Sequence, residues 1–182
     1  MNIRPAEPRE LALCVALNNR CILGESADTN TGFLLSPLSI EELAAFSNDG
    51  VLRVAVLEGD VVGFILAFKR ESKFFTNLLS LMANVEWVDP SIPSISKLMY
   101  VYKKAVEPSF RRRGIASSMY KALISEFSEF GLLGATVEKP VSNEPSRLFR
   151  ERHQYRRVGT FHAAEFEGIQ GYQSGIYFKS SL

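Results

Sequence analysis

The chain has 182 residues, of which 46% are hydrophobic and 23% are charged. This composition is ordinary for a globular protein that buries a core without disulfides or bound metal. The formal net charge of +1 argues against bulk electrostatic attraction to nucleic acid or to an anionic membrane.

The number of cysteines and the length of the apolar segments indicate the cellular compartment of the protein. Cys14 and Cys21 are the only cysteines, and with only two histidines in the chain they predict free thiols and no zinc site. Free thiols fit a reducing compartment. No apolar run approaches the ~18 residues of a membrane span, and the N-terminus lacks a signal-peptide pattern. We therefore expect a single cytoplasmic domain over residues 1–182 that binds neither nucleic acid nor membrane.

The N-terminal part of the chain predicts one strand and two helices. Residues 1–4 are the strand candidate, and residues 8–22 have the apolar spacing of an amphipathic helix. Residues 24–32 are polar and rich in turn formers, which predicts a loop. Ser39 and Glu42 have the spacing of a capping box, so the second helix is expected to begin there.

A β-hairpin and a less regular segment follow. Residues 51–57 and 61–69 have strand composition, and Glu58-Gly59-Asp60 between them has the chemistry of a tight turn. Residues 70–94 are the least regular part of the sequence, yet they contain several large apolar side chains. A segment this long and apolar is expected to pack over something and to serve function rather than to act as a free linker.

The next strand leads into a basic turn and a helix. Residues 95–106 predict the strand, and residues 115–130 predict an amphipathic helix that ends at Gly131, a typical C-terminal cap. Between them, Arg111-Arg112-Arg113-Gly114 places three cations at the helix N-terminus, where they oppose the helix dipole. Amides at such a terminus bind phosphate, and guanidinium groups add charged hydrogen bonds. The pattern indicates a pyrophosphate cradle, with a solvated basic turn as the alternative.

The remaining elements are a strand, a helix and a closing hairpin, at residues 132–138, 143–153, 158–166 and 175–181. The predicted order is β-α-α-β-β-β-α-β-α-β-β, which is an α+β arrangement with one crossover helix before the strand at 132–138. We find no internal repeat, low-complexity segment or domain linker.

Arg111-x-x-Gly114-x-Ala116, after a strand that ends in Val106-Glu-Pro, resembles the acetyl-CoA signature of the GNAT N-acetyltransferases. The element order and a looser motif at residues 143–155 are also similar to that family, and to a bacterial group within it whose acceptors are unassigned. The resemblance implies a mixed, mostly antiparallel sheet of six to seven strands, splayed between its fourth and fifth strands and flanked by about four helices. It also implies that acetyl-CoA binds in the splay, where backbone groups are free for pantetheine.

The same resemblance assigns the cofactor to particular residues. Main-chain groups of Ala105 and Val106 would pair with pantetheine, and a free amide at a bulge near Val106 would polarise the thioester carbonyl. Asn143 and Ser146 match positions near pantetheine, although Asn143 is equally well explained as a helix N-cap. The residues expected around the phosphates are Arg111, Arg112, Arg113, Gly114, Ile115, Ala116 and Ser117.

One position departs from the family pattern. Arg150 stands where many members carry a tyrosine that protonates the leaving thiolate, and arginine is a poor proton donor, although it can stabilise a thiolate electrostatically. Tyr155 is a candidate hydroxyl, with packing as the alternative. Glu138 is a candidate base, with an ion pair to Lys139 or an arginine as the alternative. His153, on a charged helix, is expected to be solvated.

The acceptor is not defined by the sequence beyond a primary amine of a small molecule or peptide. Tyr100 and Tyr102 share one face of a strand, and Phe75 and Trp87 belong to the 70–94 segment. These four are candidates for the acceptor wall, with core packing or a homodimer contact as alternatives. The alternative function is an acyl-CoA-binding or sensing protein of the same fold with little turnover. No metal is expected.

Overall fold

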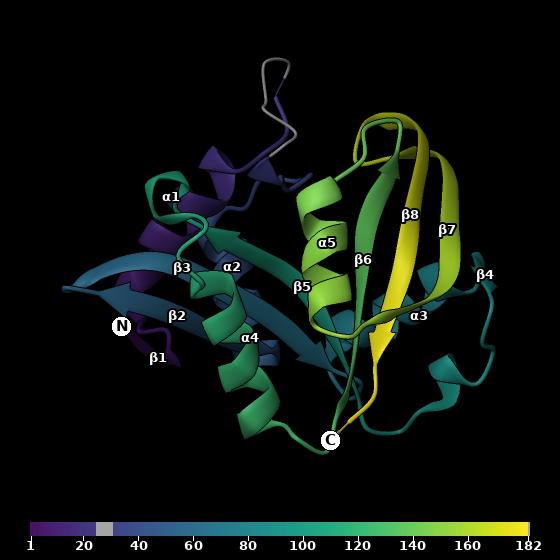
Figure 1. The fold of residues 1–182 in the computed structure, drawn as a ribbon, viewed down its shortest axis with the longest axis horizontal. Coiled ribbons are helices and arrows are strands. Elements are labelled where there is room, and N and C mark those ends of the chain that lie inside the picture. The colour runs from purple at the N-terminus through teal and green to yellow at the C-terminus, as the bar shows by residue number, and fades with distance from the viewer. Residues whose placement is uncertain (25–30, 182) are drawn as a thin grey trace.

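The computed structural model describes residues 1–24 and 31–181. These residues form one mixed sheet with the strand order β1-β2-β3-β5-β6-β8-β7-β4 and helices on both faces (Figure 1). The strands are β1 Asn2–Pro5, β2 Val51–Leu57, β3 Asp60–Lys69, β4 Val85–Trp87, β5 Leu98–Val106, β6 Gly131–Lys139, β7 Arg156–Phe166 and β8 Ile169–Lys179. The α-helices are α1 Leu11–Arg20, α2 Ile40–Asp49, α3 Lys73–Met82, α4 Ile115–Glu126 and α5 Glu144–Arg152. Short 3-10 turns are η1 Pro8–Glu10, η3 Ile92–Ser94 and η4 Pro108–Phe110.

The strand pairing confirms the predicted fold class. Neighbouring strands are antiparallel except for β5 and β6, which are parallel. β5 and β6 pair over three positions only, of which Tyr100 with Leu133 is the last. Beyond that pair the two strands diverge (Figure 1). This is the splay predicted between the fourth and fifth strands, which carry the labels β5 and β6 because the sequence does not predict the short strand β4.

Three apolar clusters hold the layers together. In Figure 1, α4 and α5 lie in front of the sheet, and α2 and α3 lie behind it. α4 buries one apolar face, including Met119 and Leu123, against β2, β3 and β5. On the other face of these strands, α1 and α2 bury Cys14 and Leu43. α3 buries Phe75 against the half of the sheet that contains β6, β7 and β8. The burial of these apolar faces is the main favourable term for the fold.

Several local predictions are confirmed. The Ser39 hydroxyl accepts from the Glu42 amide at 3.1 Å, and the Ser39 amide donates to the Glu42 carboxylate at 2.8 Å, which is the predicted capping box. β2 and β3 form the predicted hairpin. Cys14 and Cys21 are both buried free thiols. No helix in the described ranges is long and apolar enough to cross a membrane.

Other predictions need correction. The 70–94 segment is more regular than expected, because it contains α3, β4 and η3, and the Ser72 hydroxyl caps α3 by accepting from the Phe75 amide. The first helix begins at Leu11 after a 3-10 turn and not at residue 8. Gly131 does not cap α4, which ends earlier, at Glu126. It opens β6, where a Cβ would lie 2.7 Å from the Phe178 ring. Most of the predicted 24–32 loop lies outside the described residues.

Gly50 provides a test of how closely α2 meets β3. A Cβ at this position would lie 2.7 Å from the Ala67 carbonyl oxygen and 2.8 Å from a carbon of the Phe68 ring. Because backbone and a buried ring cannot yield cheaply, we expect Gly50→Ala to destabilise the protein by about 1–3 kcal/mol in urea unfolding. Gly24→Ala is the control, since nothing lies within 4 Å of its Cβ position. Equal unfolding midpoints for the two variants would contradict the described packing.

Candidate functional site

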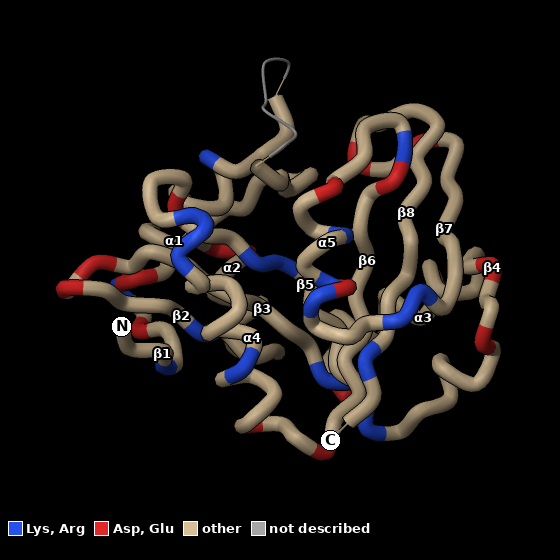
Figure 2. Tube along the Cα trace, viewed as in Figure 1, with Lys and Arg blue, Asp and Glu red and all other residues tan. Residues whose placement is uncertain are grey.

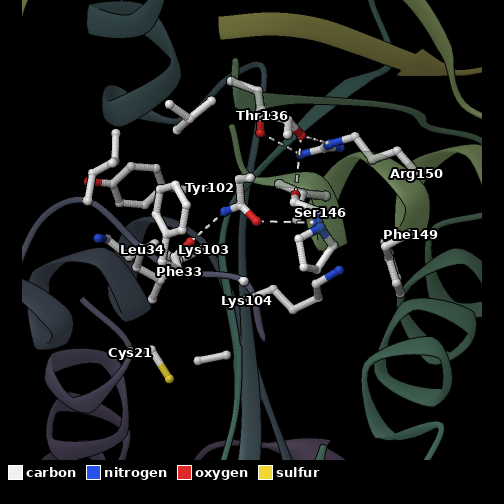
Figure 3. A pocket seen from close by; sticks show the side chains of 18 of the residues that line it. Cys21, Phe33, Leu34, Tyr102, Lys103, Lys104, Thr136, Ser146, Phe149 and Arg150 are labelled. Atoms are coloured by element: carbon white, nitrogen blue, oxygen red, sulfur yellow. Dashed lines mark hydrogen bonds between the residues drawn. The ribbon is translucent and has the colours of Figure 1, made fainter. Parts of the chain in front are cut away.

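A cavity of about 1380 Å³ passes through the splay between β5 and β6. On one side it is lined by the first turn of α4 and by α5, and on the other by aliphatic side chains of α3 and aromatic side chains of β7 and β8. Figure 3 shows side chains from β5, β6 and α5 converging on this space. The cavity therefore joins the two faces of the sheet where β5 and β6 are no longer paired.

The basic turn brings part of the predicted phosphate cradle to this cavity. Gly114 is the N-cap of α4 with φ +77°, and no side chain caps the helix, so the first-turn amides of α4 are not satisfied by a capping group. Gly114 through Ser117 line the cavity together with the exposed Arg112. Arg113 is exposed as well, but it packs on the Phe110 ring and is not part of the cavity wall.

Arg111 has a structural role that the sequence does not reveal. Its guanidinium donates to the Thr31 carbonyl at 3.0 Å, to the Cys21 sulfur at 3.2 Å and to the Val106 carbonyl at 3.3 Å. These contacts join the end of β5 to the segment after α1. Arg111 lines the cavity, but its donors are already directed at protein groups.

The main chain of β5 presents polar groups to the splay. The Glu107 amide donates to the Val62 carbonyl of β3 at 2.9 Å, so alternation directs the main-chain groups of Val106 and Lys104 away from β3. The predicted bulge near Val106 is wrong in position. Leu66 pairs with Lys103 while Ala67 pairs with Val101, which leaves Tyr102 as the extra residue. Lys103 and Lys104 face opposite sides of the sheet by the ordinary alternation of a strand, and the bulge sets which of the two faces α5.

Arg150 lies at the inner end of the splay, which is the point just after the last β5–β6 pair where the two strands begin to separate. Its side chain is 8% exposed, Nε donates to the Thr136 hydroxyl at 2.7 Å, and Nη2 donates to the Ala135 carbonyl at 2.8 Å. A Cβ on Gly134 would lie 2.5 Å from Nη2, so only glycine leaves room for the guanidinium. Burial lowers the pKa of Arg150 from its ordinary value. The tyrosine expected at this position in the family is therefore replaced by a buried cation.

Lys104 approaches the same region from β5 (Figure 3). Its ammonium lies 2.9 Å from the centre of the Phe149 ring on α5. Burial, and then the neighbouring charge of Arg150, hold the pKa of Lys104 well below its ordinary value. The sequence analysis overlooked Lys104, because a lysine in a strand gives no signal of its direction when a bulge precedes it.

The opposite face of the splay carries two tyrosines and the buried Lys103. Tyr100 and Tyr102 line the cavity with their ring centres 6.5 Å apart. Burial raises the pKa of both hydroxyls, so they remain proton donors at neutral pH. Lys103 is 4% exposed and donates to the Ser36 carbonyl at 2.8 Å and to its hydroxyl at 3.0 Å.

Asn143 and Ser146 line the cavity, but both have protein partners. The Asn143 side chain accepts from the Ser146 amide at 3.3 Å and donates to the Phe33 carbonyl at 2.8 Å. The N-cap interpretation of Asn143 therefore holds in this structure, and the bond to Phe33 bridges α5 to the segment before α2 (Figure 3). The Ser146 hydroxyl lies 3.2 Å from that of Thr136.

Two of the three candidate catalytic residues lie outside the cavity wall. The Glu138 carboxylate accepts two hydrogen bonds of 2.9 Å from Arg157 and one of 2.8 Å from Gln173. The hydrogen bonds from Arg157 lower its pKa, and the alternative interpretation as an ion pair is what the structure shows. Tyr155 is 6% exposed and packs edge-on against Tyr120, with no partner for its hydroxyl among the described residues.

The remaining candidates divide between core and cavity. Trp87 lines the cavity and donates from its indole nitrogen to the Met82 carbonyl at 3.3 Å. Phe75 is fully buried under α3 and does not reach the cavity. His153 is not solvated as predicted, because its Nε2 lies 3.0 Å from the Ser117 hydroxyl and its ring contacts Phe149.

Comparison with known proteins identifies the architecture. The model of the acetyltransferase (GNAT) family matches residues 25–155. Among solved structures, smu.2055 from Streptococcus mutans UA159 is similar with a TM-score of 0.70, 18% identity and coverage of 100% of both chains. An N-acetyltransferase from Staphylococcus aureus Mu50 has a TM-score of 0.67 and 20% identity, covering 100% of this chain and 98% of that one. NAA60 of Arabidopsis thaliana, solved with acetyl-CoA, has a TM-score of 0.66 and 18% identity over 98% of each chain. No curated protein matches the chain.

The buried ammonium of Lys103 predicts a pH-dependent stability. Burial lowers its pKa from 10.5 to about 8. Below pH 8 both folded and unfolded chains carry the charge, and the cost of burying it is fully present. Between pH 8 and 10.5 only the unfolded chain keeps the proton, so this cost is relieved as the pH rises.

We therefore expect the stability of Lys103→Met relative to the native protein to fall between pH 7 and pH 10, by on the order of 1–3 kcal/mol. Urea unfolding at the two pH values measures it. Lys73→Met, at an exposed position on α3, controls for loss of a lysine side chain. A relative stability that stays constant would show that Lys103 is not buried as described.

Proposed function

Because this chain belongs to the GNAT acetyltransferase family, we propose that it is an acetyl-CoA-dependent N-acetyltransferase that acts on a primary amine of a small molecule or peptide. The observation that carries the proposal is the cavity through the splay. It joins the uncapped N-terminus of α4 on one face of the sheet to a tyrosine- and tryptophan-lined space on the other. A donor entering from one face and an acceptor entering from the other would meet at its centre.

The first turn of α4 has the properties of a diphosphate site. The amides after Gly114 lack a capping side chain, the helix dipole is positive there, and the exposed Arg112 adds charge. A side chain on residue 114 would meet nothing within 4 Å, which leaves the approach to these amides open. We assign the phosphates of the donor to this turn.

The main chain of β5 is suited to the neutral pantetheine arm. The main-chain groups of Lys104 and the amide of Val106 point across the splay rather than toward β3, and an amide-bearing ligand can pair with them as a further strand would. The Val106 carbonyl already accepts from Arg111. On the β6 side, the carbonyls of Ala135 and Val137 already accept from α5 and its cap. The donor arm is therefore assigned to β5 and not to β6.

The reaction follows from this placement. The neutral amine attacks the thioester carbonyl carbon, a C–N bond forms, the C–S bond breaks, the amine loses a proton, and the thiolate gains one. Holding both reactants in one cavity supplies much of the rate. The buried guanidinium of Arg150, which lies next to the half-buried Lys104, lowers the cost of negative charge that develops at the inner end of the splay. Tyr100 and Tyr102 provide hydroxyl donors on the acceptor side.

Donor binding is tested first by thermal unfolding with acetyl-CoA, free CoA and ATP. At ~100 times the dissociation constant a ligand adds about 2.7 kcal/mol of stability, which is roughly 5–10 °C for a domain of this size. We expect both CoA species to stabilise the protein more than ATP does. Release of CoA thiol with a panel of primary amines then tests turnover. Binding without turnover would favour the alternative of an acyl-CoA sensor, and no binding would refute both.

Substitution of Gly114 tests the phosphate site. Gly114→Glu would place a carboxylate beside the first-turn amides at a backbone with φ +77°, so we expect at least a tenfold loss of CoA affinity by calorimetry. Gly59→Glu is a matched control, because Gly59 has φ +97°, equally open surroundings and a place in the distant β2–β3 turn. Both variants carry a similar strain of about 1–2 kcal/mol, so only the loss of affinity separates them. Equal CoA affinity in both would move the phosphate site elsewhere.

A further inference from the structure

The cavity has a strong excess of positive charge. Among the described residues that line it, seven are lysine or arginine and only one, Glu167, is acidic. Figure 2 shows basic residues on β5 and on α5, on either side of the splay. Exposed cations such as Arg112 cost little, because water solvates them. The cations at the inner end of the splay are different, because they are withdrawn from water.

Arg150 is a buried cation without an anionic partner. Its hydrogen-bond partners are neutral, namely the Thr136 hydroxyl and the Ala135 carbonyl. The rings of Tyr155 and Tyr177 lie 5.4 and 5.7 Å from its guanidinium carbon and offer only weak compensation. In the described part of the chain no aspartate or glutamate forms an ion pair with it. A buried charge of this kind is costly unless it is paired.

The half-buried Lys104 lies next to Arg150. Its side-chain nitrogen lies over the Phe149 ring, and it too has no carboxylate partner among the described residues. The two charges interact, since Arg150 disfavours the charged form of Lys104. An anion bound beside the two groups would pair with the guanidinium of Arg150 and would also favour the charged form of Lys104.

The position of Arg150 limits which anion this is. The guanidinium lies over Gly134, directly after Leu133, which makes the last pair between β5 and β6. It projects from α5, on the face of the sheet that also carries α4 (Figure 1). The donor phosphates have their own site at the start of α4, and the pantetheine arm is neutral. The part of a donor that reaches the end of the splay is its acyl group.

We propose that the preferred donor is a CoA thioester of a short dicarboxylic acid, and that Arg150, flanked by Lys104, binds the free carboxylate of its acyl group. This rests on the proposed function. A thiolate forms only during the reaction, so it does not compensate the buried charge in the resting complex, whereas a permanent carboxylate does. Guanidinium and carboxylate also form the strongest charged hydrogen bonds available to side chains. The transfer is the same as that described for the acetyl group: a C–N bond forms, the C–S bond breaks, and the amide product retains the carboxylate.

Two pairs of donors test the proposal on the native protein. Succinyl-CoA and butyryl-CoA differ only by a carboxylate in place of the terminal methyl group, and malonyl-CoA and propionyl-CoA repeat the comparison one carbon shorter. We expect kcat/KM with a common amine, and affinity by calorimetry, to favour the acidic member of at least one pair by about tenfold or more. Equal values within both pairs would overturn the proposal.

Arg150→Met tests the assigned residue, since it removes the charge and keeps an unbranched side chain. We expect the ratio of succinyl-CoA to butyryl-CoA affinity to fall toward one. Arg147→Met is the control on the same helix, because Arg147 is bound by Glu144 and Glu151 outside the cavity, and the ratio should not change. If Arg150→Met does not fold, Lys104→Met is expected to lower the same ratio. If the ratio of succinyl-CoA to butyryl-CoA affinity is unchanged in whichever of Arg150→Met and Lys104→Met folds, the assignment is refuted.

The carboxylate could instead belong to the acceptor. With acetyl-CoA as donor, phenylalanine and phenethylamine differ only by such a group, and a preference for phenylalanine that depends on Arg150 would overturn the donor assignment. The tests also separate this inference from the proposed function. Stabilisation by free CoA with no preference for acidic donors refutes the inference alone, whereas absence of any CoA binding refutes both.

Discussion

The site depends on β6 carbonyls that form hydrogen bonds with α5 and its N-cap residue instead of with the neighbouring strand β5. After Leu133, the carbonyls of Ala135 and Val137 do not pair with β5. They accept from the Arg150 guanidinium and from the main-chain amide of Asn143, respectively. Because buried carbonyls require partners, α5 and its cap stabilise the open arrangement that would otherwise cost several hydrogen bonds. Along the splay, the β6 carbonyls of Ala135 and Val137 therefore have partners, whereas on β5 the Val106 carbonyl has one in Arg111 and the main-chain groups of Lys104 face the cavity.

That asymmetry organises the rest of the cavity. The free edge belongs to β5, next to the uncapped start of α4, so the groups available to a ligand lie along one continuous path. The Asn143–Phe33 bond joins the two halves of the molecule beside this path. The guanidinium that satisfies β6 also places a positive charge at the inner end of the splay, so one residue has both a structural and an electrostatic effect.

Some features expected from the sequence depend only on neighbouring residues. Gly114 stands at the N-cap position of α4, and the side chain of Asn143 caps α5, which was one of the two interpretations of that residue. Residues whose position depends on distant segments were harder to predict. Glu138 is bound by Arg157, Tyr155 packs on Tyr120, and Phe75 belongs to the core. Their chemistry made them candidates, but their neighbours come from strands and helices far away in the sequence.

The amino-acid sequence was sufficient to predict the order of most strands and helices, the capping box at Ser39 and the basic turn before α4, because these depend on periodicity and on residues a few positions apart. Which lysine of the pair Lys103 and Lys104 faces α5 depends instead on contacts between strands. A single bulge at Tyr102 reverses the alternation of side chains, and its position is fixed by pairing with β3. Burial of Arg150 was likewise decided in three dimensions, because the space above Gly134 exists only when β6 and α5 pack together.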